Sequence, residues 1–284
     1  MKPFLLTGKN MLPNLDIVID TQDYEVDMKA GLETLQGASE ATLSIVETLV
    51  TGKVSQRHRG ARSVRTILKK TFKGSYGQIF SVEISDEELL KEYKKIGNPI
   101  FIELMSYFMK ESLYLESPEL STKAQKIVDN LGGTAEALIK KLRISSMENI
   151  HKVSTTFDHD VKIRYRKSLN EKLVIANFNK TTVLALQAKE SEKTTDIVAS
   201  ITRLNINTGN GRLLLKGAEE TVAFGFGIEY KEVRLEAKKK FSENLDYNNG
   251  IDSDKWKFLK VIARPIMLRD GKIVKYIVTG FYND

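Results

Sequence analysis

The strongest chemical signal in the sequence is a run of basic residues that contains no acid. No Asp or Glu occurs between Glu47 and Glu83, and this stretch of 35 residues holds eight Lys and Arg. Clustered cations neutralise phosphates and release condensed counterions, so they can bind nucleic acid without reading its sequence. We therefore predict contact with nucleic acid or another phosphate ligand through a loop and strand that carry Lys53, Arg57, Arg59, Arg62, Arg65, Lys69 and Lys70.

A second set of cations lies in the segment VKIRYR, residues 161–166. On a strand, side chains alternate between the two faces, so Lys162, Arg164 and Arg166 would share one face. They extend the predicted binding surface if the two basic segments approach each other. The alternative is the charged outer face of an ordinary amphipathic strand.

The charge distribution also supports a different class of function. Residues 1–50 hold three bases and eight acids, whereas residues 51–100 hold eleven bases and five acids. An acidic surface could therefore meet a basic patch on a second copy or on a protein partner. The alternative to nucleic-acid binding is an interaction or scaffold subunit that forms a homo-oligomer.

Acidic residues near the N-terminus raise a third possibility. Asp16 and Asp20 would point to the same side of one strand, as paired carboxylates do in magnesium-dependent nucleases. No recognised ligand motif accompanies them. The chain has no Cys and three His, and it contains neither a nucleophile elbow nor a Walker loop. We therefore assign no catalytic residue, no metal ligand and no cofactor, and we favour a non-enzymatic protein.

Hydrophobic periodicity predicts an α+β fold with three modules. Residues 1–85 should form an α+β module with a buried strand at LDIVID, a long helix ending before Gly52, and a hairpin around residues 73–75. Residues 86–150 have helical periodicity and should form a helical layer or insertion. Residues 151–284 should form a β-rich module, with further strands at KLVIANF and TVLALQA, a helix over residues 229–245, and a hairpin at Asp270-Gly271.

The segment ITRLNINTGNGRLLLKGAEETVAF resembles the first strands of cold-shock and other OB-like domains. These domains share a strand, an Asn- and Gly-containing turn and two more strands, and the resemblance implies a small β-barrel that binds nucleic acid. Cold-shock domains carry stacking aromatic residues on these strands, whereas this chain has Leu204, Leu213 and Leu215 there. The wider layout is similar to a group of uncharacterised bacterial proteins. That similarity implies a bacterial or phage origin, with a role in phage-host conflict as a speculation.

The sequence also predicts where the protein is located in the cell. The first residues lack the apolar core and cleavage site of a signal peptide, and the most apolar stretch, residues 96–113, is interrupted by charges. We expect a cytoplasmic protein without a membrane partner.

Overall fold

The computed structural model describes residues 12–23, 25–55, 63–72, 76–168 and 170–282. The chain divides into two compact units, residues 1–186 and 187–284. The sequence predicts a module boundary near residue 151, whereas the structure places the division after Leu186. The reason is that two strands beyond residue 151 join the first sheet, one paired with the N-terminal strand and the next paired with that one.

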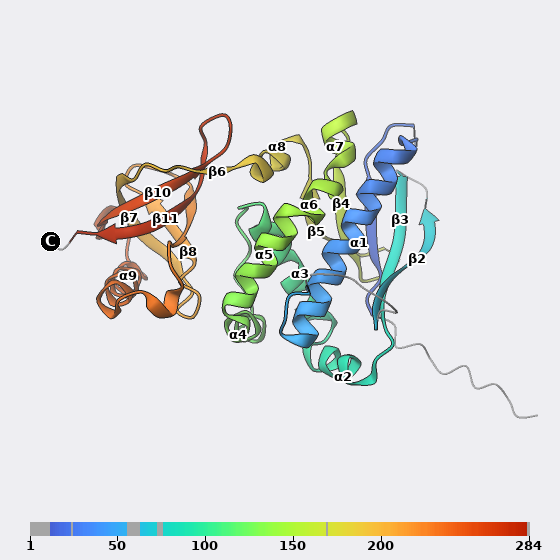
Figure 1. The fold of residues 1–284 in the computed structure, drawn as a ribbon, viewed down its shortest axis with the longest axis horizontal. Helices are drawn as coiled ribbons and strands as arrows, with labels where there is room; N and C mark the ends of the chain where they lie inside the picture. Colours follow the sequence, from blue (N-terminus) through green and yellow to red (C-terminus); the bar gives the residue numbers. More distant parts are fainter. Residues whose placement is uncertain (1–11, 24, 56–62, 73–75, 169, 283–284) are drawn as a thin grey trace, which may run out of the picture. The chain divides into compact units, whose positions relative to one another are not determined.

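The first unit is an antiparallel five-stranded sheet covered by helices (Figure 1). The strand order is β2-β3-β1-β4-β5. Its strands are β1 (Leu15–Ile19), β2 (Val64–Phe72), β3 (Tyr76–Ile84), β4 (Val161–Arg166) and β5 (Lys172–Phe178). Since β1, a helix, β2 and β3 precede the helical layer and β4, the unit has the split β-α-β connectivity of ferredoxin-like sheets, with β5 added at one edge.

The helices over residues 28–51 and 87–150 fall in segments where the sequence periodicity predicts helices, whereas those over residues 152–157 and 180–183 lie in the part predicted to be β-rich. The helices of this unit are α1 (Met28–Thr51), α2 (Glu87–Ile96), α3 (Asn98–Ser112), α4 (Thr122–Leu131), α5 (Gly133–Ile144), α6 (Ser146–Ile150), α7 (Lys152–Phe157) and α8 (Lys180–Val183). The sequence predicts a strand at TVLALQA, residues 182–188, and this prediction is wrong. Asn179 and Thr182 form a capping box, which starts α8 and leads into a 3₁₀ turn instead.

Helix α1 is the central packing element of the first unit. Its N-terminus is capped by Asp27, whose side chain accepts a hydrogen bond from the Ala30 N–H at 2.9 Å, and it ends at Gly52 in the left-handed conformation. Gly37 lies where a Cβ would approach the backbone nitrogen of Ile150 to 2.5 Å. A glycine inside this helix therefore allows α1 and α6 to pack closely.

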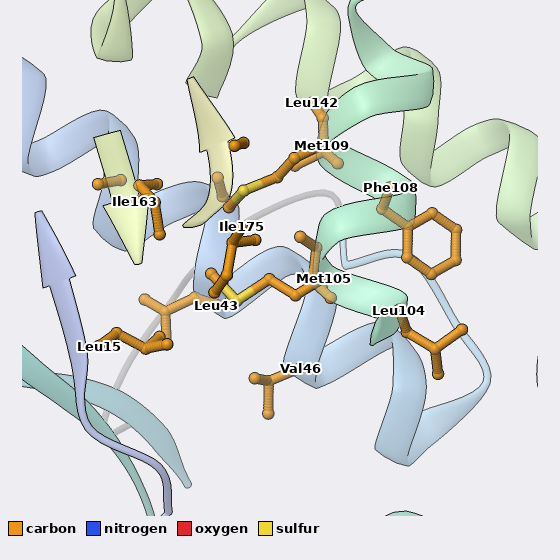
Figure 2. Close-up of a cluster of buried hydrophobic side chains, with 14 of the residues drawn as sticks. Leu15, Leu43, Val46, Leu104, Met105, Phe108, Met109, Leu142, Ile163 and Ile175 are labelled. Carbon is orange, nitrogen blue, oxygen red and sulfur yellow. The ribbon is translucent and has the colours of Figure 1, made fainter. Parts of the chain in front are cut away.

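The helices cover one face of the sheet only. Leu15, Ile17 and Ile19 of β1 belong to the main hydrophobic core, whereas Val18, which points the other way, does not. Figure 2 shows Met105 and Met109 extending from α3 toward Leu43 and Ile175 in this core. The opposite face of the sheet carries most of the charged side chains of the strands, together with apolar residues such as Val18 and Ile79.

The second unit contains a small closed β-barrel. Together with the helix-covered sheet of the first unit, it confirms the predicted α+β class. Its elements are β6 (Lys189–Glu190), β7 (Thr195–Leu204), β8 (Gly211–Leu215), β9 (Thr221–Phe226), α9 (Leu235–Asn248), β10 (Leu259–Met267) and β11 (Ile273–Phe281). Strands β7, β8 and β9 form a meander, β10 pairs with β7 and β11, and β11 runs parallel to β9. Five strands closed in this way, with a helix between the third and fourth, have the arrangement of an OB-fold.

The predicted hairpin at Asp270-Gly271 is confirmed, since β10 and β11 are antiparallel neighbours and Gly271 has a φ of 85°. The hairpin of β2 and β3 is confirmed by their antiparallel register, although its turn, residues 73–75, lies outside the described residues. In the described part of the chain, no helix combines the length and apolar character needed to cross a bilayer.

Candidate nucleic-acid interface

The strand register gathers most of the predicted cations on the helix-free side of the first sheet. We call this surface the open face. It is made by Arg65, Ile67, Lys70 and Phe72 of β2, Gly77, Ile79, Ser81 and Glu83 of β3, Asp16 and Val18 of β1 with Asp20 just after it, Lys162, Arg164 and Arg166 of β4, and Lys172, Val174 and Asn177 of β5. Directly paired residues of neighbouring strands point to the same side. One row of partners therefore runs from Lys70 through Ile79 and Asp16 to Arg164.

The Phe72 ring lies over its cross-strand partner, Gly77, because this partner has no side chain. Phe72 pairs with Gly77 across β2 and β3, and a Cβ on Gly77 would lie 2.3 Å from the ring. The guanidinium carbons of Arg166 and Arg164 lie 5.0 and 5.6 Å from the ring centroid, within cation–π range. A partly exposed aromatic ring is thus flanked by two arginines.

Both arginines are held by one buried carboxylate. Arg166 donates from Nε to Asp16 Oδ1 at 2.8 Å and from Nη2 to Oδ2 at 2.9 Å, and Arg164 Nη2 donates to Oδ2 at 3.1 Å. The Asp16 side chain is fully buried. Fork-like pairing of this kind fixes guanidinium geometry, and it compensates the cost of removing a carboxylate from water.

The other cations predicted from the sequence differ in whether they pair with an acid, lie exposed or lie outside the sheet. Lys162 pairs with Asp20 at 2.8 Å and Arg65 with Glu83 at 2.6 Å. Lys69 lies at a β-bulge next to the open face and donates to Asn14 Oδ1 at 2.6 Å, and Lys70 is exposed. Lys53 follows α1 and does not belong to the sheet. Arg57, Arg59 and Arg62 lie outside the described residues.

The two basic segments, separated by about ninety residues of sequence, therefore meet on one sheet. Among the described residues, the open face holds six cations, Arg65, Lys70, Lys162, Arg164, Arg166 and Lys172, against three carboxylates, Asp16, Asp20 and Glu83. Its formal balance is positive by three charges.

Phe72 and Gly77 are absent from the residues predicted from sequence. An aromatic residue at the end of a strand is usually part of the core, and a lone glycine in a strand signals at most a bulge or a close approach. The pattern of an aromatic directly opposite glycine across a short hairpin was the available signal. Reading it requires the exact register, which depends on the bulge between Leu68 and Lys70.

The two acids considered as metal ligands serve as partners of cations. Asp16 binds Arg164 and Arg166, and Asp20 binds Lys162. Within the described ranges, no three His, Asp or Glu side chains gather as metal ligands would.

His151 is a buried histidine whose ring nitrogens contact α6 and α8 of the first unit. Its Nδ1 lies 2.7 Å from the Met147 carbonyl and its Nε2 lies 2.8 Å from Thr182 Oγ1. Because a carbonyl only accepts, Nδ1 carries a proton, and neutral Nε2 accepts from the threonine hydroxyl. Burial lowers the pKa of His151 from 6.5 to about 4, so the side chain is neutral near pH 7.

The barrel has a cationic row of its own, but its members make internal contacts. Arg203, Arg212 and Lys275 align across β7, β8 and β11 through Ala223 of β9. Arg212 is buried and donates twice to Thr221, each time at 2.7 Å. Lys275 Nζ donates to Asn210 Oδ1 at 3.2 Å.

The leucines at the positions of stacking aromatics in cold-shock domains face the barrel core. Leu213 is fully buried, and Leu204 and Leu215 pack against the same cluster. These three leucines therefore do not form a base-stacking surface on the barrel. Comparison of the chain with protein-family models, with curated proteins and with solved structures finds no match.

Proposed function

We propose that the protein binds single-stranded nucleic acid on the open face of the first sheet and acts without catalysis. The observation that supports this proposal is the position of Phe72 over Gly77, within cation–π distance of Arg164 and Arg166. Proteins that bind single strands combine aromatic platforms for the bases with cations for the backbone. Both groups occur together on this surface.

Base stacking on Phe72 would favour single-stranded over double-stranded nucleic acid. An aromatic side chain can stack on a base only when the base is unstacked from its neighbours, as in single strands and loops. A sheet face with one aromatic ring offers no helix or ribbon to enter a duplex groove. We therefore expect preference for single strands over duplexes.

The phosphates would be bound by cations that still have N–H groups not used within the protein. A guanidinium has five N–H donors. Asp16 accepts from two of them on Arg166 and from one on Arg164. Lys70 adds an exposed ammonium in the same row as Arg164. Asp16 in this scheme orients the arginines and reduces their net charge.

The test is fluorescence anisotropy with labelled single-stranded DNA, single-stranded RNA and duplex DNA at about 50 and 200 mM salt. Phe72→Ala should weaken binding of single strands by about 1–3 kcal/mol, the range of one base–aromatic stack. Phe157→Ala, which removes a partly exposed Phe from α7, is the matched control and should leave affinity unchanged.

The electrostatic part is tested through the salt dependence. Lys70→Ala should reduce the slope of log K against log salt by about 0.7, the loss of one contact to a single strand. Lys94→Ala on α2 is the control, because it removes an exposed lysine from a helix and not from a strand of the open face. Unchanged affinity in both Phe72→Ala and Lys70→Ala, or equal losses in the controls, would refute the proposal.

A further inference from the structure

A second surface lies on the helix-covered side of the same sheet, at its β2 edge. An apolar cavity of about 400 Å³ opens there between α1 and β2. Ile17 and Phe80 of the sheet line it together with Leu35 of α1 and Leu68 of β2. The volume falls within the range of ligand-binding pockets, about 300–1,000 Å³.

Apolar side chains continue from this cavity into solvent. Met28, Leu32 and Leu35 are spaced by four and three residues, so they lie along one side of α1. Met28 and Leu32 are exposed, and Leu68 is 61% exposed. These side chains therefore continue the apolar lining of the cavity along α1 as an apolar stripe.

The strand that borders this groove has an open edge. Among the described strands, β2 pairs with β3 alone. An edge strand points every second N–H and C=O away from the sheet, where another strand can pair with them. The segment Val64–Leu68 is regular, because the bulge of β2 begins only after Leu68. A sixth strand placed here would lie over the apolar stripe of α1.

The charges on β2 indicate which kind of strand could pair with its open edge. This strand exposes three cations, Arg65, Lys69 and Lys70, and holds no acid of its own. Arg65 pairs with Glu83 of β3 and Lys69 donates to Asn14, so the edge keeps a net positive charge. Pairing β2 with β2 of a second copy would bring like charges opposite each other, which is destabilising. A strand with acidic side chains would instead be attracted.

We propose that the β2 edge binds an extended peptide of a partner protein, in which apolar and acidic side chains alternate. The peptide adds to Val64–Leu68 as a sixth strand, its apolar side chains enter the groove beside α1, and its acidic side chains meet the cations of β2. Main-chain hydrogen bonds supply affinity and the groove supplies selectivity, as in other cases of strand addition. The groove lies on the opposite side of the sheet from Phe72, whereas Arg65 and Lys70 belong to both surfaces, so the effects of Leu68→Ser and of Phe72→Ala distinguish failure of one proposal from failure of the other.

The experiment uses the full chain and a labelled peptide, acetyl-Glu-Val-Glu-Leu-Glu-Val-Glu-amide, followed by anisotropy. We expect binding that weakens about tenfold in Leu68→Ser and in Leu32→Ser, the loss of one apolar contact. Leu173→Ser is the matched control, because Leu173 is 59% exposed and lies on β5, the opposite edge of the same sheet. Its affinity should not change.

Three modified peptides separate the contributions. A lysine version should lose binding through charge. A version with the same residues grouped in blocks lacks the alternation and should not bind. Methylation of alternate backbone nitrogens should abolish binding when the methylated groups are those that face β2, and should leave binding intact when they are the other set. Equal binding of the alternating and block peptides, or no binding of the alternating peptide, would overturn the proposal.

Hydrogen exchange of β2 identifies other occupants. In the free chain, the outward amides of Val64–Leu68 should exchange readily and become protected when peptide binds. Protection that increases with protein concentration would place a second copy on the edge. Protection at every concentration would place other residues of the same chain there. Either result would overturn the proposal.

Discussion

Replacing Asp16 with asparagine removes a negative charge from the centre of the open face and keeps the side-chain size. In the wild-type chain, Asp16 accepts three hydrogen bonds from Arg166 and Arg164. An asparagine can accept with its oxygen, but its amide nitrogen would turn N–H groups toward the guanidinium donors. Two neighbouring cations would then share a site without a counterion.

The expected cost follows from the burial of the three groups. Breaking a buried ion pair by removing one partner costs about 3–5 kcal/mol. Here the carboxylate is fully buried, while the side chains of Arg166 and Arg164 retain 13% and 21% exposure, so water can partly solvate them. We expect Asp16→Asn to lower the free energy of unfolding by about 3 kcal/mol. In a unit of 186 residues this corresponds to a Tm lower by roughly 6–12 °C.

Thermal and urea unfolding followed by circular dichroism measure this effect, and Asp20→Asn is the control. Asp20 also pairs with a cation of β4, Lys162, but its side chain is 49% exposed, so the loss should be about 0–1 kcal/mol. Both variants raise the net charge of the open face by one, and both should tighten binding of single-stranded oligonucleotides. If Asp16→Asn were no more destabilising than Asp20→Asn, the reasoning from burial would be wrong.

Three further predictions concern packing and pH. Gly77→Ala should displace the Phe72 ring and weaken oligonucleotide binding, whereas Gly133→Ala, where a Cβ meets no neighbour within 4 Å, should not. Because the pKa of His151 falls from 6.5 to about 4 on folding, the unfolded chain binds the proton first, and urea titrations should show stability falling by about 3 kcal/mol as pH drops from 6.5 to 4. A His151→Gln chain should lose this pH dependence, and its persistence would contradict the assignment. Phe241→Ala should destabilise the barrel unit by about 3–5 kcal/mol in hydrogen exchange, since this ring is fully buried in the barrel core.

Part of the candidate site could be predicted from the sequence because charge and alternation are local properties. The period of two in VKIRYR placed Lys162, Arg164 and Arg166 on one side of β4, and the structure has them there. The charge count marked Arg65 and Lys70, which lie on the same face. The counterions of these residues could not be predicted. Asp16 precedes Arg166 by 150 residues, and nothing local links them.

The sequence by itself determined the elements with local causes. The capping of α1 by Asp27, the turn at Gly271 and the alternation of the strands depend on neighbouring residues and backbone sterics. Only the tertiary structure decided that β4 and β5 join the N-terminal sheet and that Phe72 lies over Gly77. Pairing between distant segments is chosen by competition among all available strand edges and apolar faces of the folded chain. Such competition has no signature within any single segment.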